Sequence, residues 1–215
     1  MDPSVSDVAR VRFVKFAKPG MGRRASVRIT RDPSYKAPAS FVSLKEELGL
    51  GSKPESLAAV VALHAKLAQA TFEHHSNHIP MLALYDKSWN QIDFMSTAFT
   101  DQAEKYLFWR DVADRAFYLR AFAMVWTSES WVRDISGGMG PPIRELPIIG
   151  EQLHVVGADA SDGCEVITWE IQRPNETDNP VLVRVSADDP RQAGHFNFTR
   201  PVVAAMKMAH ASGAT

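Results

Sequence analysis

The sequence has 215 residues, 45% hydrophobic and 23% charged with a formal net charge of −1, which argues against a mostly disordered chain and a collagen-like fibre. Its longest apolar runs are only a few residues, far short of the roughly 20 that cross a bilayer, so we expect a cytoplasmic protein with no membrane segment. The single cysteine, Cys164, allows neither an internal disulfide nor a thiolate metal cluster.

The charge is uneven along the chain. Residues 1–40 contain nine Lys or Arg against three Asp, a sum of +6, so the remaining 175 residues carry −7. Apolar and basic residues alternate over 10–16 and 25–30, on either side of a turn that contains Gly and Pro. We therefore expect a basic amino-terminal hairpin or arm over 1–40, followed by a single α+β domain over 41–215.

Four arginines of this basic segment are candidates for contact with nucleic acid or an acidic partner, because each could neutralise a phosphate or a carboxylate. They are Arg23, Arg24, Arg28 and Arg31. Basic side chains on an edge strand also prevent edge-to-edge aggregation, so a purely structural role stays open.

A capping-box pattern at Ser52 and Glu55 predicts a helix from residue 52 to about Asn77, ended by Pro80. Apolar residues spaced by three and four positions predict the stripe that this helix buries. The stripe is Val60, Leu63, Leu67, Ala70 and His74.

Histidines gather at the end of this predicted helix. If the helix persists, His74 and His78 lie one turn apart on one face, the spacing with which a helix presents two imidazoles to zinc. Glu73, or Glu129 from further along the chain, adds a carboxylate, so this group is a candidate divalent-metal site. Histidine near a helix carboxyl end also interacts favourably with the helix dipole, so a structural role is the competing interpretation, and we expect no cofactor.

A second helix follows a predicted hairpin made of residues 81–85 and 91–95. It begins at a cap formed by Thr100 or Asp101. The side predicted to face the core carries Trp109, Val112, Ala113 and Ala116.

Aromatic residues cover nearly all sides of this second helix. Because one helix cannot bury every side against one sheet, the surplus predicts a second contact surface, either the histidine-bearing helix or another chain. The candidate interface residues are Tyr106, Phe108, Trp109 and Tyr118. Packing within the core is the alternative.

Residues 121–126 are apolar on both faces, as is typical of a central strand. The stretch from Ala121 to Val132 begins AFAMVWTSESW and leads into a Pro-rich turn and paired strands. In these features it resembles a group of uncharacterised bacterial and phage proteins. The resemblance implies no assigned activity, and no catalytic residue is transferred from it.

The remaining pattern predicts a Gly- and Pro-rich loop over 136–147, three strands and a closing helix from Thr199 to about His210. The strands are 152–157, 165–171 and 181–186. This order predicts an α+β fold in which helices pack on an antiparallel sheet of about five strands. The element order is similar to that of longin, roadblock and profilin-like domains.

The sequence presents no set of nucleophile, base and oxyanion donors, and no three metal ligands at recognisable spacing. We therefore expect a non-catalytic interaction protein that binds another protein chain or itself. The first alternative is a metal-dependent hydrolase that uses the histidine cluster. The second is a nucleic-acid-binding protein that uses the basic amino-terminal segment.

Overall fold

The computed structural model describes residues 9–10, 30–31, 53–97, 102–134, 142, 145–174, 179–185 and 197–211. The chain divides into two compact units, Met1–Ser52 and Lys53–Thr215. In the first unit, β1 (Ala9–Arg10) pairs antiparallel with β2 (Thr30–Arg31). A domain boundary at residue 40 stays a prediction, because residues 32–52 lie outside the described ranges.

The second unit has the predicted α+β architecture. Within the described residues, six strands form one antiparallel sheet in the order β4-β3-β5-β6-β7-β8, one strand more than expected. None of the helices described is both long and apolar enough to cross a bilayer. In chain order the elements are α2 (Leu57–His75), β3 (Met81–Tyr85), β4 (Gln91–Ser96), α3 (Gln102–Tyr118), β5 (Ala123–Arg133), β6 (Ile148–Asp159), β7 (Cys164–Gln172), β8 (Val181–Arg184), a 3-10 turn (Asn197–Thr199) and α4 (Arg200–Ala211).

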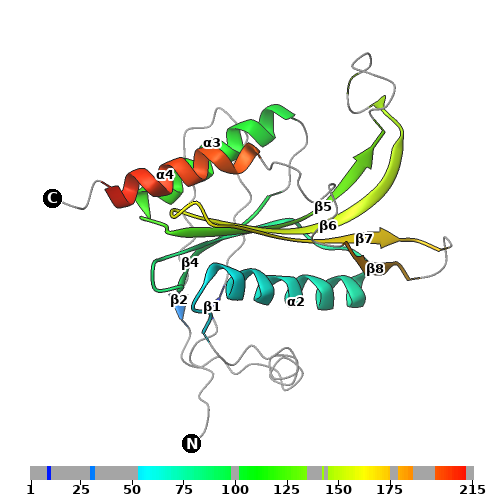
Figure 1. Cartoon of the computed structure of the whole chain (residues 1–215), viewed down its shortest axis with the longest axis horizontal. Coiled ribbons are helices and arrows are strands. Elements are labelled where there is room, and N and C mark those ends of the chain that lie inside the picture. The colour runs from blue at the N-terminus through cyan, green and yellow to red at the C-terminus, as the bar shows by residue number, and fades with distance from the viewer. Residues whose placement is uncertain are drawn as a thin grey trace, which may run out of the picture. The chain divides into compact units, whose positions relative to one another are not determined.

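Alternate residues of each strand face opposite sides of the sheet and so build two separate cores. On one side, Val125 of β5 packs in a cluster with Val61 of α2. On the other side, Met124 of β5 packs in a cluster with Trp109 of α3 and Met206 of α4. Figure 1 shows α2 along one face of the sheet and α3 and α4 along the other. The sheet is therefore the middle of three layers, which buries β5 on both faces as its sequence predicts.

Helix α2 begins later and ends earlier than predicted. Its amino-terminal cap is Ser56, whose hydroxyl oxygen accepts a hydrogen bond from the backbone N–H of Ala59. At the other end Ser76 adopts a left-handed conformation with φ of 59°, and its N–H donates to the carbonyl of Phe72. This cap ends the helix at His75, so residues 76 and 77 are not helical.

The buried side of α2 is also rotated from the predicted stripe. Leu63 and Leu67 are only half-buried, and His74 is exposed. Phe72 is fully buried against the sheet, and burying this large side chain outweighs burying the predicted leucines. The residues of α2 that are buried are Leu57, Val60, Val61, His64, Ala65, Ala68 and Phe72.

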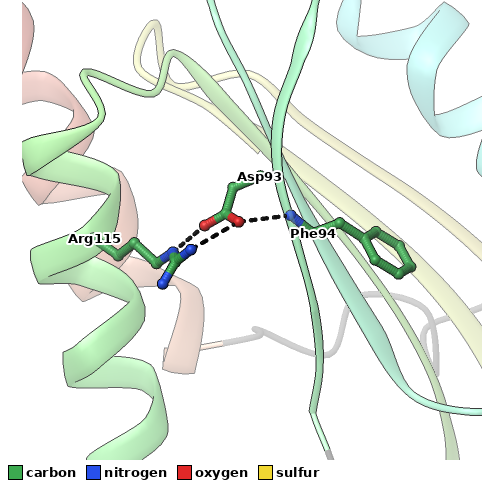
Figure 2. Close-up of polar contacts among 3 residues, drawn as sticks. All are labelled: Asp93, Phe94 and Arg115. Atoms are coloured by element: carbon green, nitrogen blue, oxygen red, sulfur yellow. Dashed lines mark hydrogen bonds and ion pairs between the residues drawn. The ribbon is translucent and has the colours of Figure 1, made fainter. Parts of the chain in front are cut away.

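An ion pair joins β4, at one edge of the sheet, to α3 (Figure 2). The carboxylate of Asp93 accepts hydrogen bonds from Nε and Nη2 of Arg115, and one of its oxygens also accepts from the backbone N–H of Phe94. The side chain of Asp93 is 6% exposed and that of Arg115 is 31% exposed. This bidentate ion pair holds α3 over the edge of the sheet.

Candidate functional site

The side of α3 that faces away from the sheet carries large apolar side chains. The opposite side is filled by Trp109, Val112 and Ala116, which are buried in the core. The helical repeat turns other large side chains toward solvent, with Tyr106 63% exposed and Tyr118 76% exposed. We call the following residues the outer face of α3: Tyr106, Leu107, Arg110, Asp114, Phe117 and Tyr118.

Two of the four predicted interface residues, Tyr106 and Tyr118, lie on this outer face. Trp109 does not, because its ring packs against those of Trp126 and Phe198 in the core, at centroid distances of 5.8 Å and 4.6 Å. Phe108 is half-buried against the same core. The structure therefore corrects the position of Trp109 from interface to core.

Sequence reasoning missed Leu107, which is 47% exposed. The helical repeat contains the signal that could have found it. Residues at 109, 112 and 116 define the buried side, and position 107 lies about 160° from position 109 around the helix axis. An apolar residue so far from the buried stripe needs another surface to cover it.

The structure does not bring the three predicted metal ligands together. His74 is exposed on the last turn of α2, where its ring contacts that of His75. Glu73 is also exposed and accepts a hydrogen bond from Gln69 Nε2 at 2.8 Å. His78 lies beyond the end of the helix and is buried, so the one-turn spacing from His74 is not present. Among the described residues, no three His, Cys, Asp or Glu side chains form a group that could hold a metal ion.

His78 instead lies beside Glu129, the residue considered as a further carboxylate. The backbone N–H of His78 donates to the carboxylate of Glu129. Burial raises the pKa of Glu129, against the lowering effects of this hydrogen bond and of the charge on Arg173. Burial also lowers the pKa of His78, against the raising effect of a hydrogen bond with the backbone of Ile79.

A second buried histidine, His64, belongs to α2 and lies on the side of this helix that packs against the sheet. Nε2 of His64 is 2.7 Å from the hydroxyl oxygen of Tyr85 on β3. Burial, with a smaller contribution from the charge on His78, lowers the pKa of His64 to about 4, and burial raises the pKa of Tyr85. Both side chains are therefore neutral at pH 7. Neither was predicted as a site residue, and His64 was missed because the predicted stripe of α2 placed His74 in the core instead.

The other side of the sheet holds a chain of hydrogen bonds that the sequence analysis also missed. His154 of β6 lies 2.8 Å from the hydroxyl of Ser130 through Nε2 and 3.0 Å from the hydroxyl of Thr168 through Nδ1. These residues come from three adjacent strands, β5, β6 and β7. The strand alternation could have indicated that all three share one face.

The Ser130–His154 distance resembles that of a serine nucleophile and its base, but the third group is a hydroxyl and not a carboxylate. Burial lowers the pKa of His154 to about 4, which makes the imidazole a weak base at neutral pH. The chain of hydrogen bonds satisfies buried polar groups and fixes the alignment of the three strands.

The predicted nucleic-acid contacts fall mostly outside the described residues. Arg23, Arg24 and Arg28 are not among them. Arg31 belongs to β2, where its backbone pairs with that of Ala9. The outer face of α3, which gathers several large exposed apolar side chains on one helix, is the candidate functional site.

Comparison with known proteins gives a family match. Residues 11–179 match the family model described as bacteriophage lambda protein ea47. Protein ea47 of Escherichia phage lambda is 40% identical over 166 residues, which is 76% of this chain. The match covers 40% of that relative, so this chain spans less than half of its length. No solved structure matches the chain. The family match confirms the resemblance to phage proteins predicted from residues 121–132.

Proposed function

Because the chain belongs to the bacteriophage lambda protein ea47 family, whose description names no reaction, we propose a function from its geometry. The chain is a non-catalytic protein that binds a protein partner, either another chain or a second copy of itself. The binding surface is the outer face of α3. Its expected cytoplasmic location stays a prediction.

One observation carries this proposal: large apolar side chains project into solvent from one side of a helix whose opposite side is fully buried. Leu107 and Phe117, 47% and 38% exposed, lie between the more exposed tyrosines at 106 and 118. Soluble monomers rarely leave many large apolar side chains of one surface uncovered. Tyrosine and arginine, which are enriched at the energetic centres of protein interfaces, are both present.

The alternative of a metal-dependent hydrolase has less support, because His74 and His78 are separated by the end of α2. The alternative of a nucleic-acid-binding protein stays a prediction, since the arginines on which it depends lie outside the described residues or have no described side chain. It would be supported by affinity for DNA that falls steeply with salt and disappears when residues 1–40 are removed.

Photo-crosslinking from the outer face tests the proposal. A photoreactive phenylalanine analogue replaces Tyr118 in the full chain, and the protein is irradiated in the cells that produce it. We expect one discrete covalent adduct, to a second copy or to another protein, identified by mass spectrometry.

The matched control carries the same analogue at Gln69, an exposed position on α2. This control reports random collisions of an exposed helix. We expect no discrete adduct from position 69. Absence of an adduct from position 118, or equal adducts from both positions, would contradict the proposed function.

A further inference from the structure

The outer face of α3 has the same character when the helix is read in either direction. Val112 is the midpoint, and the outer-face positions equally far from it carry matching or complementary side chains. The pairs are Tyr106 with Tyr118, Leu107 with Phe117, and Arg110 with Asp114.

All six of these residues are exposed. At 100° per residue they lie within an arc of about 120° on the helix, and the twelve steps from Tyr106 to Tyr118 span about 18 Å along its axis. They therefore form one strip along the helix, with apolar side chains at its two ends and charged side chains at its centre. Arg110 stacks on the ring of Tyr106, which orients the guanidinium along this strip.

We propose that the outer face of α3 binds a second copy of this chain, with the two α3 helices antiparallel about a twofold axis at the level of Val112. This inference rests on the proposed function and names its partner. In a twofold interface every contact occurs twice. If one residue of the first copy contacts a second residue of the other copy, the same two residue positions also meet with the copies exchanged. Arg110 of each copy therefore lies opposite Asp114 of the other, and apolar side chains meet at both ends, with Tyr106 of each copy beside Phe117 of the other and Leu107 beside Tyr118.

The charges select both the partner and its direction. A parallel arrangement would place each Arg110 beside the other Arg110 and each Asp114 beside the other Asp114, so both contacts would repel. An unrelated partner would need no matching of charges about the centre of the helix. The symmetry of the strip is what points to a second copy.

Charge reversal in the purified full chain tests this arrangement. The variant Arg110→Glu places a glutamate opposite Asp114 at both contacts, and Asp114→Arg places an arginine opposite Arg110. We expect each variant to raise the dimer dissociation constant at least about tenfold, measured by sedimentation equilibrium. Circular dichroism checks that both variants fold.

Mixing the two variants gives the decisive result. In a mixed dimer, the glutamate introduced at position 110 of one chain faces the arginine introduced at position 114 of the other, and the unaltered Asp114 of the first chain faces the unaltered Arg110 of the second. We therefore expect the equimolar mixture to dimerise about as tightly as the unaltered protein, and the double variant Arg110→Glu/Asp114→Arg to do the same. Changes within one helix cannot explain recovery on mixing.

The control is Lys66→Glu, a charge reversal on an exposed position of α2, which should leave dimerisation unchanged. The inference would be overturned if both single variants had the dissociation constant of the unaltered dimer. It would also be overturned if mixing the two weakened variants did not restore tight dimerisation. An unaltered protein that is monomeric throughout would also overturn it. For a monomeric protein, the photo-crosslinking result at position 118 separates the two proposals. Capture of a different protein would support the proposed function and leave only the dimer overturned. No capture would contradict both the dimer and the proposed function.

Discussion

A buried carboxylate that is paired with a guanidinium destabilises the folded protein when the guanidinium alone is removed. Asp93 is such a group, since its side chain is almost fully buried and its partner Arg115 comes from a different element (Figure 2). Replacing Arg115 leaves the carboxylate without its counter-charge, and removing one partner of a buried pair is far more costly than removing both. The contact therefore identifies a residue whose loss the fold should tolerate poorly.

We expect Arg115→Met to lower the free energy of unfolding by about 3 kcal/mol, measured by urea denaturation. The double variant Asp93→Asn/Arg115→Met should recover part of this loss, because it no longer buries an unpaired charge. Arg173→Met is the matched control. Arg173 pairs with Glu151 at the surface, so its replacement should cost less than about 1 kcal/mol. Equal losses for both single variants would show that the Asp93 contact does not anchor α3.

At the scale of elements, periodicity predicted the type and order of the helices and strands but not where they end. The sequence indicates a central strand only over residues 121–126, where both faces are apolar. In the structure β5 continues to Arg133, since β6 supplies hydrogen-bond partners along its whole length. A long-range pairing of this kind leaves no signal in the strand's own sequence.

The rotation of α2 has a similar cause. The predicted stripe and the observed one both satisfy the helical repeat, so the repeat alone cannot choose between them. The sheet makes the choice, because it offers a close approach at Gly157 of β6. There a methyl group on Gly157 would collide with Cγ2 of Val61 and lie 3.0 Å from Cδ1 of Leu57.

This close approach predicts that Gly157→Ala destabilises the domain by about 1–3 kcal/mol, because Val61 is fully buried and a valine on a helix has little freedom to change its rotamer. The measurement is again the free energy of unfolding in urea. Removing the obstructing methyl groups in Gly157→Ala/Val61→Ala should make the cost of the glycine replacement smaller than it is in the unaltered background.

Gly150→Ala provides the control on the same strand, since the added Cβ would meet nothing closer than Val132 at 3.9 Å. Its effect should be less than about 1 kcal/mol. If Gly157→Ala lowers the free energy of unfolding no more than Gly150→Ala does, the position of α2 on the sheet does not depend on having glycine at residue 157.

At the scale of the whole molecule, the candidate site was only partly predictable. An excess of aromatic residues on one helix indicated a second surface, and Tyr106 and Tyr118 are exposed as that interpretation requires. Trp109 is buried, as its place on the predicted core side of the helix requires, so its assignment to an interface on the basis of aromatic content was wrong. The buried histidines were missed because their burial depends on α2 and on neighbouring strands that lie far from them in the sequence.

These buried histidines lie on both faces of the sheet, so their protonation affects the domain as a whole. The pKa of His64 and that of His154 are both lowered to about 4, from an ordinary value of 6.5. Between these values the unfolded chain binds more protons than the folded protein, so the free energy of unfolding falls as the pH drops from 6.5 towards 4. The lowered pKa of His78 acts in the same direction, and the raised pKa of Glu129 opposes it at the acidic end.

We expect each of these two histidines to reduce the free energy of unfolding by roughly 2 kcal/mol between about pH 7 and pH 5, measured by urea denaturation at both values. His64→Gln should remove its share of this pH dependence, whatever it does to stability at pH 7. His74→Gln, on the exposed side of the same helix, is the control for the change of side chain alone. If the free energy of unfolding still falls by the same amount between pH 7 and pH 5 in both His64→Gln and His154→Gln, these two imidazoles do not cause the loss of stability in acid.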